Sequence, residues 1–389
     1  MSTLPAHLDL LIVGGGPVGG ALALSLADSG LSIGVIEARR EPGKDARALA
    51  LAHASSAALA AIGVWPANAA TAIHTVHVSQ QHSFGRVKLD RSELDLPALG
   101  YVMPYGALAT AIHKQLPAQS HIHYLTGARV TEVATLDGYA AVTLERDGET
   151  HLITTRLAVL AEGGALLGSV GIEQGSRTYG QHALVAEVET DRPHRHQAYE
   201  RFADDGPIAF LPVGGESNRY AVVWTRPEND PLQASTLADA DFLVQLQDRI
   251  GERVGLLQSV GPRAHFPLTL RWASQHYARR TVVIGNAAQT LHPVAGQGFN
   301  LGLRDALTLA RLIKATPADR LGETNMLERF DALRRTDSLA TIGFTDNLIR
   351  LFGMEAPPIR AGRALGLAAL GNCKPLRRSF AHRMVFGNA

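Results

Sequence analysis

The sequence predicts an α/β fold with a second, mainly antiparallel β-sheet domain and a C-terminal helical segment. Three patterns lead to this prediction. Residues 8–13 form a short apolar run that stops at glycines, as a buried parallel strand does. Residues 179–224 contain several strand-like runs in succession, which indicates an antiparallel sheet. Residues 281–284 form another short apolar run, and a glycine-rich loop and a helical pattern follow it.

The length and composition of the chain limit the classes of function that are possible. The chain has 389 residues, which suits two connected domains. Its formal net charge of +1 gives no field that would attract nucleic acid, so no nucleic-acid partner is expected. The single cysteine, Cys373, excludes a disulfide framework and fits a reducing compartment. No basic leader precedes the first apolar run and no apolar stretch is long enough to span a bilayer. We therefore expect a cytoplasmic protein, soluble or attached to the inner membrane surface.

The elements follow in order along the chain. Residues 8–13, 17–29 and 32–36 form a strand, a helix and a strand, which is a βαβ unit. Residues 48–62 are predicted as an alanine-rich helix, 75–89 as strands and 103–116 as a helix. Strands are predicted over 130–144 and 154–161, around a turn at Asp147-Gly148. The second sheet takes its strands from residues 182–188, 196–202, 208–212 and 220–224. Helices at 237–250 and 299–313 flank the strand at 281–284.

The first glycine loop has the spacing Gly14-x-Gly16-x-x-Gly19, which is typical of a dinucleotide-binding, Rossmann-type unit. Gly14 permits the tight turn, Gly16 lets the backbone approach a pyrophosphate, and Gly19 allows close packing of helix on strand. Pro17 opens the helix whose N-terminus stabilises the phosphate charge. Glu37 ends the second strand, where a ribose-binding carboxylate belongs. A purely structural glycine turn is the alternative.

The second loop distinguishes FAD from NAD, which the first loop alone does not. Gly285 ends a strand, and the side chain of Asn286 could reach a ribityl hydroxyl. Gly296, Gln297 and Gly298 would place backbone N–H groups and a helix N-terminus beside a flavin ring, where partial positive charge stabilises the anionic reduced flavin. Two such loops predict an FAD held at both ends. An ordinary bend before a helix is the alternative.

On these residues the chain resembles the class A flavoprotein aromatic monooxygenases, which share the para-hydroxybenzoate hydroxylase fold. Within them it resembles the ubiquinone-biosynthesis hydroxylases, and most of all the branch that acts on 2-polyprenyl-6-methoxyphenols. The resemblance covers nearly the whole length and is sharpest at residues 8–65, 198–212 and 285–306. Asn286 and Gln289, where the wider family has Asp and His, indicate the branch. The carbonyl of Asn286 still accepts a hydrogen bond, and only the charge is lost.

The resemblance implies an FAD-dependent aromatic-ring hydroxylase, a monooxygenase of the EC 1.14.13 type. NAD(P)H would reduce FAD, and O2 would then form a C4a-hydroperoxyflavin that hydroxylates the phenol ring of a polyprenylated ubiquinone precursor. It also implies a domain division. The FAD-binding domain would be discontinuous, the substrate-binding β-sheet domain would lie between its parts, and a helical tail would end the chain. The boundaries are, in that order, 1–70, 100–170 and 272–345; 71–99 and 171–271; and 346–389.

The resemblance also assigns individual residues. Arg47 would lie on the flavin side, near the pyrophosphate or the ring, although a solvated surface cation is the alternative. His292 and Pro293 would lie beside the flavin, and His292 is a candidate to bind the substrate or relay a proton, since its unperturbed pKa is near neutrality. A structural histidine is the alternative. The remaining predicted cofactor contacts are Val130, Phe299 and Asn300.

Three weaker candidates and a group of histidines complete the list of possible site residues. Tyr179, Gln181 and His182 could line the substrate face, although residues on a strand surface are the alternative. No metal site is predicted, because no suitably spaced carboxylate or cysteine accompanies the clustered histidines. These histidines are His74, His77, His82, His121 and His123.

Two features leave alternatives open. The family's Asp-Gly motif, which is linked to FAD and NAD(P)H, appears here as Glu162-Gly163 without the usual Arg after it, so the reductant stays open. Residues 356–389 contain basic side chains but no carboxylate side chain. This tail could rest on anionic lipid, dock onto a ubiquinone-biosynthesis complex or cap the FAD domain. A flavin-dependent reductase or epoxidase, or a flavin-binding scaffold subunit of such a complex, are the alternative functions.

Overall fold

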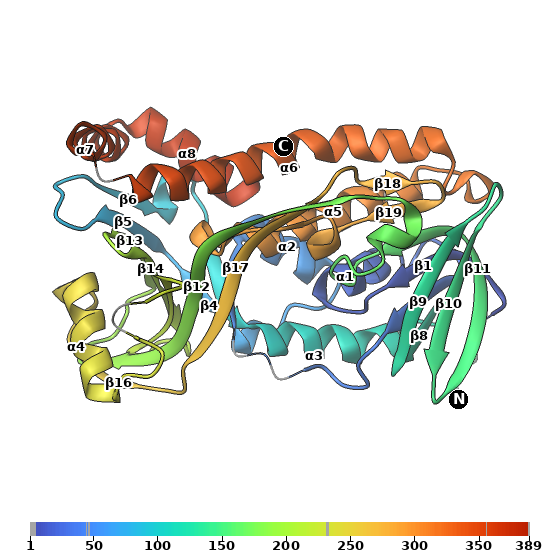
Figure 1. Ribbon diagram of the computed structural model, residues 1–389, viewed down its shortest axis with the longest axis horizontal. Helices are drawn as coiled ribbons and strands as arrows, with labels where there is room; N and C mark the ends of the chain where they lie inside the picture. The colour runs from blue at the N-terminus through green and yellow to red at the C-terminus, as the bar shows by residue number, and fades with distance from the viewer. Residues whose placement is uncertain (1–4, 44, 46, 231–232, 355, 388–389) are drawn as a thin grey trace.

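The computed structural model describes residues 5–43, 45, 47–230, 233–354 and 356–387. The first four residues of the predicted FAD-binding domain, and residues 355, 388 and 389 of the predicted tail, lie outside the described residues. Two large β-sheets lie toward opposite ends of the molecule (Figure 1). The long strands β12 (Gln174–Thr190) and β17 (Ala264–Ala273) extend from the second sheet toward the first. The C-terminal helices lie along one side.

The first sheet is parallel at its centre, where the strand order is β8-β2-β1-β11-β19. Strand β18 pairs antiparallel with β19 at one edge, and β9 and β10 extend β11 as an antiparallel meander. The predicted turn joins β10 to β11, with left-handed φ angles at Asp147 (55°) and Gly148 (85°). The strands are β1 (His7–Val13), β2 (Ile33–Glu37), β8 (Ile122–Thr126), β9 (Ala128–Thr135), β10 (Ala140–Arg146), β11 (Glu149–Leu160), β18 (Tyr277–Ala278) and β19 (Thr281–Val283).

Helix α1 (Pro17–Ser25) connects β1 to β2 and packs between this sheet and helix α5 (Gln297–Lys314). Its close approach to the strand depends on Gly19, because a Cβ there would lie 2.0 Å from the carbonyl oxygen of Gly14. The backbone packing expected of the third glycine is therefore present. The helix ends four residues earlier than predicted, since residues 26–29 form tight turns that lead the chain back to β2.

The prediction of one helix over residues 48–62 is wrong in its first third. Ala48–Ala52 forms strand β3, and helix α2 begins only at His53 and ends at Ala61. Strand β3 pairs antiparallel with β7 (Gly100–Pro104), whose other edge pairs with β4 (Thr71–Ile73). Alanine favours helix in isolation, but these pairings with distant residues outweigh a weak local preference. The small sheet brings β3 against the start of α5.

The second sheet has the order β20-β17-β12-β15-β14-β13-β5-β6, and β16 also pairs with β12. It is antiparallel except where β13 and β5 run parallel. The strands predicted between residues 182 and 224 are confirmed. One face packs against helix α4 (Asp239–Ile250) through large aromatic side chains such as Trp224 and Phe242. The remaining strands are β5 (Thr75–Gln80), β6 (Arg86–Asp90), β13 (Gln197–Ala203), β14 (Gly206–Val213), β15 (Arg219–Pro227), β16 (Leu257–Val260) and β20 (Gln289–Thr290).

The C-terminal helices join the two halves. Helix α6 (Thr324–Gly353) runs along the molecule, so the predicted boundary at residue 346 falls inside one continuous helix (Figure 1). Helices α7 (Pro357–Asn372) and α8 (Lys374–Phe386) follow, and Ala381 and Val385 of α8 pack against Val87 and Leu89 of β6. Helix α3 (Tyr105–Gln115) covers α1. None of the helices among the described residues has the length and apolar composition that crossing a bilayer requires.

Candidate active site

A cavity of about 560 Å³ lies where the two sheets and the C-terminal helices meet. Its walls come from four sources: the loops that follow β1 and β19, the small sheet of β3, β7 and β4 with its flanking residues, one face of the second sheet, and the inner sides of α6, α7 and α8. Most of the lining side chains are apolar. Such a cavity suits a ligand with a large hydrophobic part, and its few polar groups would fix the orientation of that ligand.

The first glycine loop delivers the N-terminus of α1 to this cavity. Gly16, Pro17 and Val18 belong to the lining. Helix α1 has no side-chain N-cap and no acidic residue in its first turn, so its N–H groups and its dipole are available to an anion. A Cβ on Gly16 would meet only the Tyr105 hydroxyl, at 3.6 Å, which leaves the backbone here open to a ligand.

Glu37 lies beside this loop at the end of β2. Its carboxylate accepts hydrogen bonds from the N–H groups of Gly15 (2.9 Å) and Arg39 (3.0 Å). Glu37, Gly14 and Gly19 are not among the residues that line the cavity. These three residues therefore shape and brace the turn, while Gly16 and Pro17 face the open space.

The second glycine loop follows β19, which runs parallel to β1 two strands away, so both loops leave the same edge of the first sheet and reach the same cavity. Ala295 and Gly296 both have a φ of 60°, and Gly296 is the N-cap of α5. Helix α5, like α1, has no side-chain cap and no acidic residue in its first turn. A left-handed alanine is strained, which is common where a loop is shaped for function. The predicted site residues of this loop that line the cavity are Gly285, Asn286, His292, Pro293, Gly296, Gln297, Gly298, Phe299 and Asn300.

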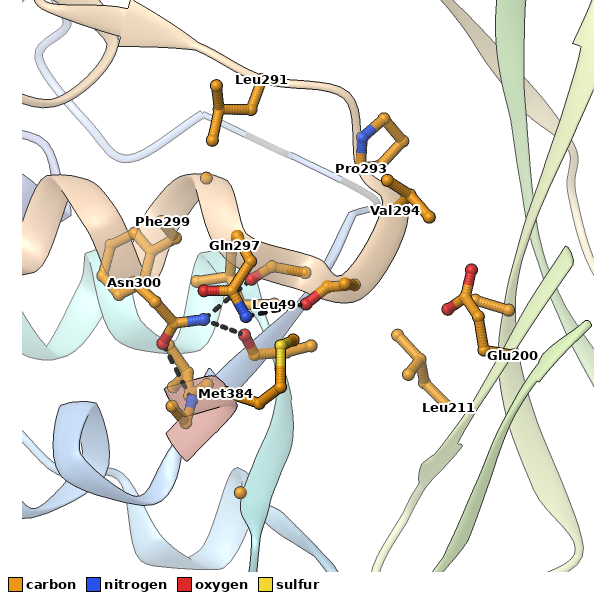
Figure 2. A pocket seen from close by; sticks show the side chains of 18 of the residues that line it. Leu49, Glu200, Leu211, Leu291, Pro293, Val294, Gln297, Phe299, Asn300 and Met384 are labelled. Atoms are coloured by element: carbon orange, nitrogen blue, oxygen red, sulfur yellow. Dashed lines mark hydrogen bonds between the residues drawn. The ribbon is translucent and has the colours of Figure 1, made fainter. Parts of the chain in front are cut away.

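The side chain of Asn300 anchors the loop to its neighbours. Its amide donates to the carbonyl oxygens of Ala50 (3.0 Å) and Gly296 (2.8 Å), and its oxygen accepts from the Ala52 N–H (2.8 Å) and the Ser55 hydroxyl (2.7 Å). Figure 2 shows these bonds converging on Asn300. Four bonds use the full capacity of the amide. This side chain thus holds α5 against β3 and α2, and only its remaining surface faces the cavity.

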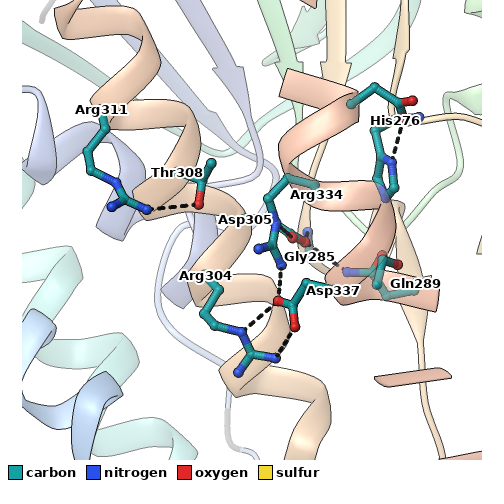
Figure 3. Close-up of polar contacts among 11 residues, drawn as sticks. His276, Gly285, Gln289, Arg304, Asp305, Thr308, Arg311, Arg334 and Asp337 are labelled. Carbon is teal, nitrogen blue, oxygen red and sulfur yellow. Dashed lines mark hydrogen bonds and ion pairs between the residues drawn. The ribbon is translucent and has the colours of Figure 1, made fainter. Parts of the chain in front are cut away.

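A buried ionic network supports Gly285 from below (Figure 3). One carboxylate oxygen of Asp305 accepts from the Gly285 N–H (3.2 Å) and the Gln289 side chain (2.8 Å), and the other accepts from Arg334 (2.8 Å). The same Arg334 side chain also donates a hydrogen bond to Asp337 (2.7 Å). Gln289, which stands where the wider family has His, therefore has a structural partner in this protein.

Arg47 reaches across the cavity rim. It forms an ion pair with Asp45 at 2.6 Å, and its guanidinium lies 5.6 Å from the ring centroid of Tyr105 and 5.8 Å from that of Phe266. Phe266 belongs to β17 and Tyr105 opens α3, so the Arg47 side chain connects the start of α3 to the second sheet. The side chain is half-exposed and lines the cavity. It is therefore available to a negatively charged ligand.

His292 is almost fully buried. Burial lowers the pKa of its imidazole from the usual 6.5 to about 4. Its Nδ1 accepts the N–H of Val294 at 3.1 Å, so its proton resides on Nε2, which has no hydrogen-bond partner among the described residues. The ring of Tyr179 meets the imidazole edge-on, with the centroids 5.2 Å apart. His292 is consequently neutral near pH 7, because the ring is shielded from water and its pKa lies below the unperturbed value that made it a candidate proton relay.

Other predicted residues lie outside the lining. Tyr179 touches His292, whereas Gln181 and His182 lie further along β12 and pair with β17 and β15. Val130, on β9, packs against the apolar cluster on the outer side of the first sheet and does not reach the cavity. The described residues contain no group of three or more His, Cys, Asp or Glu side chains placed to hold a metal ion.

The carboxylate of Glu162 forms hydrogen bonds within its own backbone turn. It accepts the N–H groups of Gly164 (2.7 Å) and Ala165 (3.0 Å). The longer side chain at the family's Asp-Gly motif thus closes a backbone turn after β11. Ala161, immediately before it, belongs to the cavity lining.

Sequence reasoning missed most of the cavity wall. Residues 198–202 were recognised as part of the family resemblance, but not as a site. Their alternation, with Ala198, Glu200 and Phe202 on one face of β13, is the signal that could have identified the wall. The apolar positions of α6 to α8 carried no comparable signal, because their inner face is defined only by contacts with distant strands.

Two uncapped helix N-termini that open onto one cavity fit a dinucleotide. The chain matches the FAD binding domain family over residues 7–337. It is 38% identical to the ubiquinone hydroxylase UbiL of Rhodospirillum rubrum, over 96% of this chain and 88% of that protein. The chain belongs to the FAD-dependent ubiquinone-biosynthesis hydroxylases. It is also 30% identical to the 3-demethoxyubiquinol 3-hydroxylase of Escherichia coli, over 95% of this chain and 96% of that protein.

The fold of this hydroxylase is shared with solved aromatic hydroxylases. The crystal structure of p-nitrophenol 4-monooxygenase PnpA from Pseudomonas putida superposes with a TM-score of 0.78, at 18% identity, over the whole of both chains. The family, the fold, the FAD cofactor and the monooxygenase class predicted from the two glycine loops and the resemblance are thereby confirmed.

Proposed function

We propose that this hydroxylase hydroxylates the ring of a polyprenylated phenol in ubiquinone biosynthesis, of the 2-polyprenyl-6-methoxyphenol type, with NAD(P)H and O2 as co-substrates. One observation carries the proposal: the cavity that begins at the two glycine loops continues between the second sheet and the C-terminal helices. A phenol ring with a long apolar tail needs both parts. The relatives named for ubiquinone and demethoxyubiquinol support the same substrate class.

FAD would be held at both ends by the residues of the glycine loops. The α1 N-terminus, shaped by Gly14, Gly16, Pro17 and Gly19, would bind the pyrophosphate, with Glu37 near the ribose and Arg47 at the rim. Gly285, Asn286 and residues 293–300 would bind the ribityl chain and the ring. Bound FAD supplies the hydride acceptor for NAD(P)H and activates O2 for transfer to the phenol.

The surroundings of the ring position suit this chemistry. The uncapped N-terminus of α5 provides partial positive charge that stabilises negative charge on a reduced ring. His292 is neutral near pH 7, so the helix N-terminus supplies the positive potential without a full charge on this side chain. The apolar walls limit water near the reacting atoms, which matters because the reaction with O2 would otherwise release hydrogen peroxide instead of hydroxylating the phenol.

The prenyl tail would lie against the C-terminal helices. Transfer of apolar surface out of water contributes roughly 25 cal/mol for each Å² that is buried, so a tail of several isoprene units would supply much of the binding energy. In this assignment residues 71–99 and 171–271 bind the substrate, and residues 346–389 cover its tail. The helix side chains that line this part of the cavity are Phe344, Leu348, Phe352, Leu367, Leu370, Phe380, Ala381, Met384 and Val385.

The test uses the purified holoenzyme, a prenylated 2-methoxyphenol in detergent micelles, NADH or NADPH, and O2. We expect O2 consumption coupled to one added oxygen atom in the product, which mass spectrometry detects and NMR assigns to a ring carbon. A reductase would instead consume NAD(P)H anaerobically and leave product mass without the oxygen atom. A scaffold subunit would bind FAD without turnover. Either of these outcomes with prenylated phenols would overturn the proposal.

We also propose that α7 and α8 rest on an anionic membrane surface. Leu365 of α7 and Leu376 of α8 are 62% and 55% exposed, and Lys374, Arg378 and Arg383 of α8 are exposed as well. Exposed apolar side chains together with basic side chains favour binding to anionic lipid. The same two helices line the proposed tail site, so a tail leaving the bilayer would meet it directly.

Vesicle flotation tests this contact. We expect the holoenzyme to float with vesicles that contain anionic phospholipid and to float less with purely zwitterionic ones. The double variant Leu365→Ser and Leu376→Ser should lose most of this binding. Leu152→Ser is the matched control, because Leu152 is 65% exposed on β11 of the first sheet. Equal flotation of all three proteins would contradict the contact.

A further inference from the structure

One carboxyl group stands on an otherwise apolar wall of the cavity. The second sheet lines the cavity with side chains from β5, β6, β13, β14 and β15. On this face Glu200 of β13 has Val78 of β5 and Ala209 of β14 as its cross-strand neighbours. The other side chains that this face contributes are Val76, Val87, Leu89, Ala198, Phe202, Leu211 and Val223. Such a wall would be complete without an acid, so the acid needs an explanation.

Glu200 has no partner that would explain it structurally. Among the described residues, none forms an ion pair or a hydrogen bond with its carboxyl group. Burial alone raises the pKa of Glu200 from the usual 4.5 to about 8. The side chain is partly buried and faces the cavity, and an acid enclosed by apolar side chains without a partner costs folding free energy, so native proteins rarely keep one without a use. The small side chain of Ala209 next to it leaves space in front of the carboxyl.

The other titratable side chains around the cavity do not neutralise it. These are Arg47 just before β3, Tyr105 at the start of α3, His292 in the second loop, and Tyr199, the neighbour of Glu200 on its own strand. His292 is neutral near pH 7, and α6 to α8 line the cavity with apolar side chains only. Glu200 is therefore the acid of this site that can change its charge near neutral pH.

The position of Glu200 matches that of a group that meets the substrate ring. Figure 2 shows Glu200 and Leu211 on strands of the second sheet, across the open space from Pro293 and Val294. The flavin ring is assigned to the Pro293 side, so a phenol stacked in front of it would lie between that loop and the sheet. This argument rests on the proposed function, because it assumes a phenolic substrate.

We propose that Glu200 is a catalytic residue that binds the phenolic hydroxyl of the substrate and takes its proton. In this step the phenol O–H bond breaks, an O–H bond forms on the Glu200 carboxylate, and the negative charge moves to the phenolate oxygen. A phenolate ring is richer in electrons than a phenol ring and reacts faster with an electrophilic oxygen. Glu200 returns the proton to the product oxygen before release, so the cycle is balanced and needs no further reactant.

Glu200 is well suited as a base for the phenolic hydroxyl of the substrate. A general base is most effective when its pKa lies near the working pH, and a free surface carboxylate is too weak a base for a phenol. The apolar wall strengthens Glu200 as a base through desolvation. The same wall excludes water that would compete for the hydroxyl.

The first test compares wild type with Glu200→Gln as holoenzymes, using kcat/KM for a prenylated 2-methoxyphenol across pH 6 to 9. In wild type we expect kcat/KM to rise about fivefold between pH 7 and pH 8, because the carboxylate form increases through a pKa of about 8. In Glu200→Gln we expect kcat/KM to fall on the order of 100-fold and this rise to disappear. Glu187→Gln is the control, because Glu187 lies exposed on β12 in an ion pair with Arg219.

The second test measures ligand binding and the unfolding temperature, neither of which requires turnover. Wild type should bind 2-methoxyphenol more tightly than its O-methyl ether, as followed by the absorbance change of bound FAD, and Glu200→Met should lose this preference. Glu200→Met should also unfold at a higher temperature than wild type, since an apolar side chain of similar length removes an unpaired acid from an apolar, partly buried wall. A residue retained for structure would give the opposite shift.

These outcomes separate the two proposals. If wild type converts no phenol, the proposed function fails, while the preference for phenol over its ether still decides the role of Glu200. If wild type turns over and Glu200→Gln keeps both the rate within threefold and the rise with pH, the role of Glu200 is refuted. An unchanged preference in Glu200→Met refutes it as well.

Discussion

Asp305 of α5 and Arg334 of α6 form a buried ion pair, 2.8 Å between Oδ1 and Nε, directly beneath the second glycine loop. Asp305 has no exposed surface, and its second oxygen accepts the N–H of Gly285. One carboxylate therefore fixes the relative position of a long C-terminal helix and the turn that follows β19. Figure 3 shows how Asp337 and Arg304 extend this network between α5 and α6.

Asp305→Asn should destabilise the protein strongly and loosen the loop. The change removes the charge that pairs with buried Arg334 and replaces one acceptor oxygen with an NH2 donor, and breaking a buried pair costs about 3 kcal/mol or more. We expect the free energy of unfolding in urea to fall by about that amount, and the FAD content of the purified protein to fall with it. Asp147→Asn is the control, because Asp147 pairs with Arg40 on the surface, where such pairs contribute about 0–1 kcal/mol. A loss no larger than that of the control would show that the network does not hold the loop.

The two glycine loops could be predicted from the sequence because their backbone geometry restricts which residues are allowed. Gly14 and Gly19 are required where helix and strand touch, and such local demands leave a readable spacing. Strand β3 could not be predicted in the same way, because its hydrogen-bond partner, β7, lies some fifty residues away.

The contacts of the polar side chains around the loops could not be predicted from the sequence either. Gln289 appeared as a family departure, but its bonds to Asp305 and Ser338 depend on how α6 packs. Glu200 lay inside a recognised segment, yet its environment is set by Val78 and Ala209 on other strands. Side chains whose function depends on several distant elements leave no local pattern.

Gly19→Ala should prevent FAD binding. A Cβ at residue 19 would lie 2.0 Å from the carbonyl oxygen of Gly14, so α1 must move away from β1 and its N-terminus must leave the cavity. We expect a protein that retains secondary structure by circular dichroism but is purified without the flavin absorbance. Gly343→Ala is the matched control, since a Cβ there meets nothing within 4 Å inside α6. That variant should keep FAD and gain about 0.5–1 kcal/mol of stability. Full FAD content in Gly19→Ala would contradict the packing argument.

His292 should make the protein less stable as the pH falls below 6.5. In the unfolded chain the imidazole titrates at its usual pKa of 6.5, but burial lowers the pKa in the folded protein to about 4. Between these values the unfolded state binds a proton that the folded state does not, so acid favours unfolding. We expect the free energy of unfolding to drop by about 2 kcal/mol from pH 7 to pH 5 through this residue. Urea unfolding of His292→Gln should show a correspondingly smaller drop, whereas the exposed His121→Gln should match wild type.

Ala381→Phe should shorten the prenyl tail that the enzyme accepts. Ala381 is buried on α8 and lines the cavity beside Val385, against β6. A phenyl ring there would fill the proposed tail site, at a cost in stability of about 1–3 kcal/mol from overpacking. We expect kcat/KM for a long-chain prenylated phenol to fall at least tenfold, with little change for the same phenol carrying a single isoprene unit. Ala332→Phe on the exposed side of α6, away from the cavity lining, is the control. An equal loss for both substrates would place the tail elsewhere, because a blocked corridor discriminates by length whereas a general distortion of the site does not.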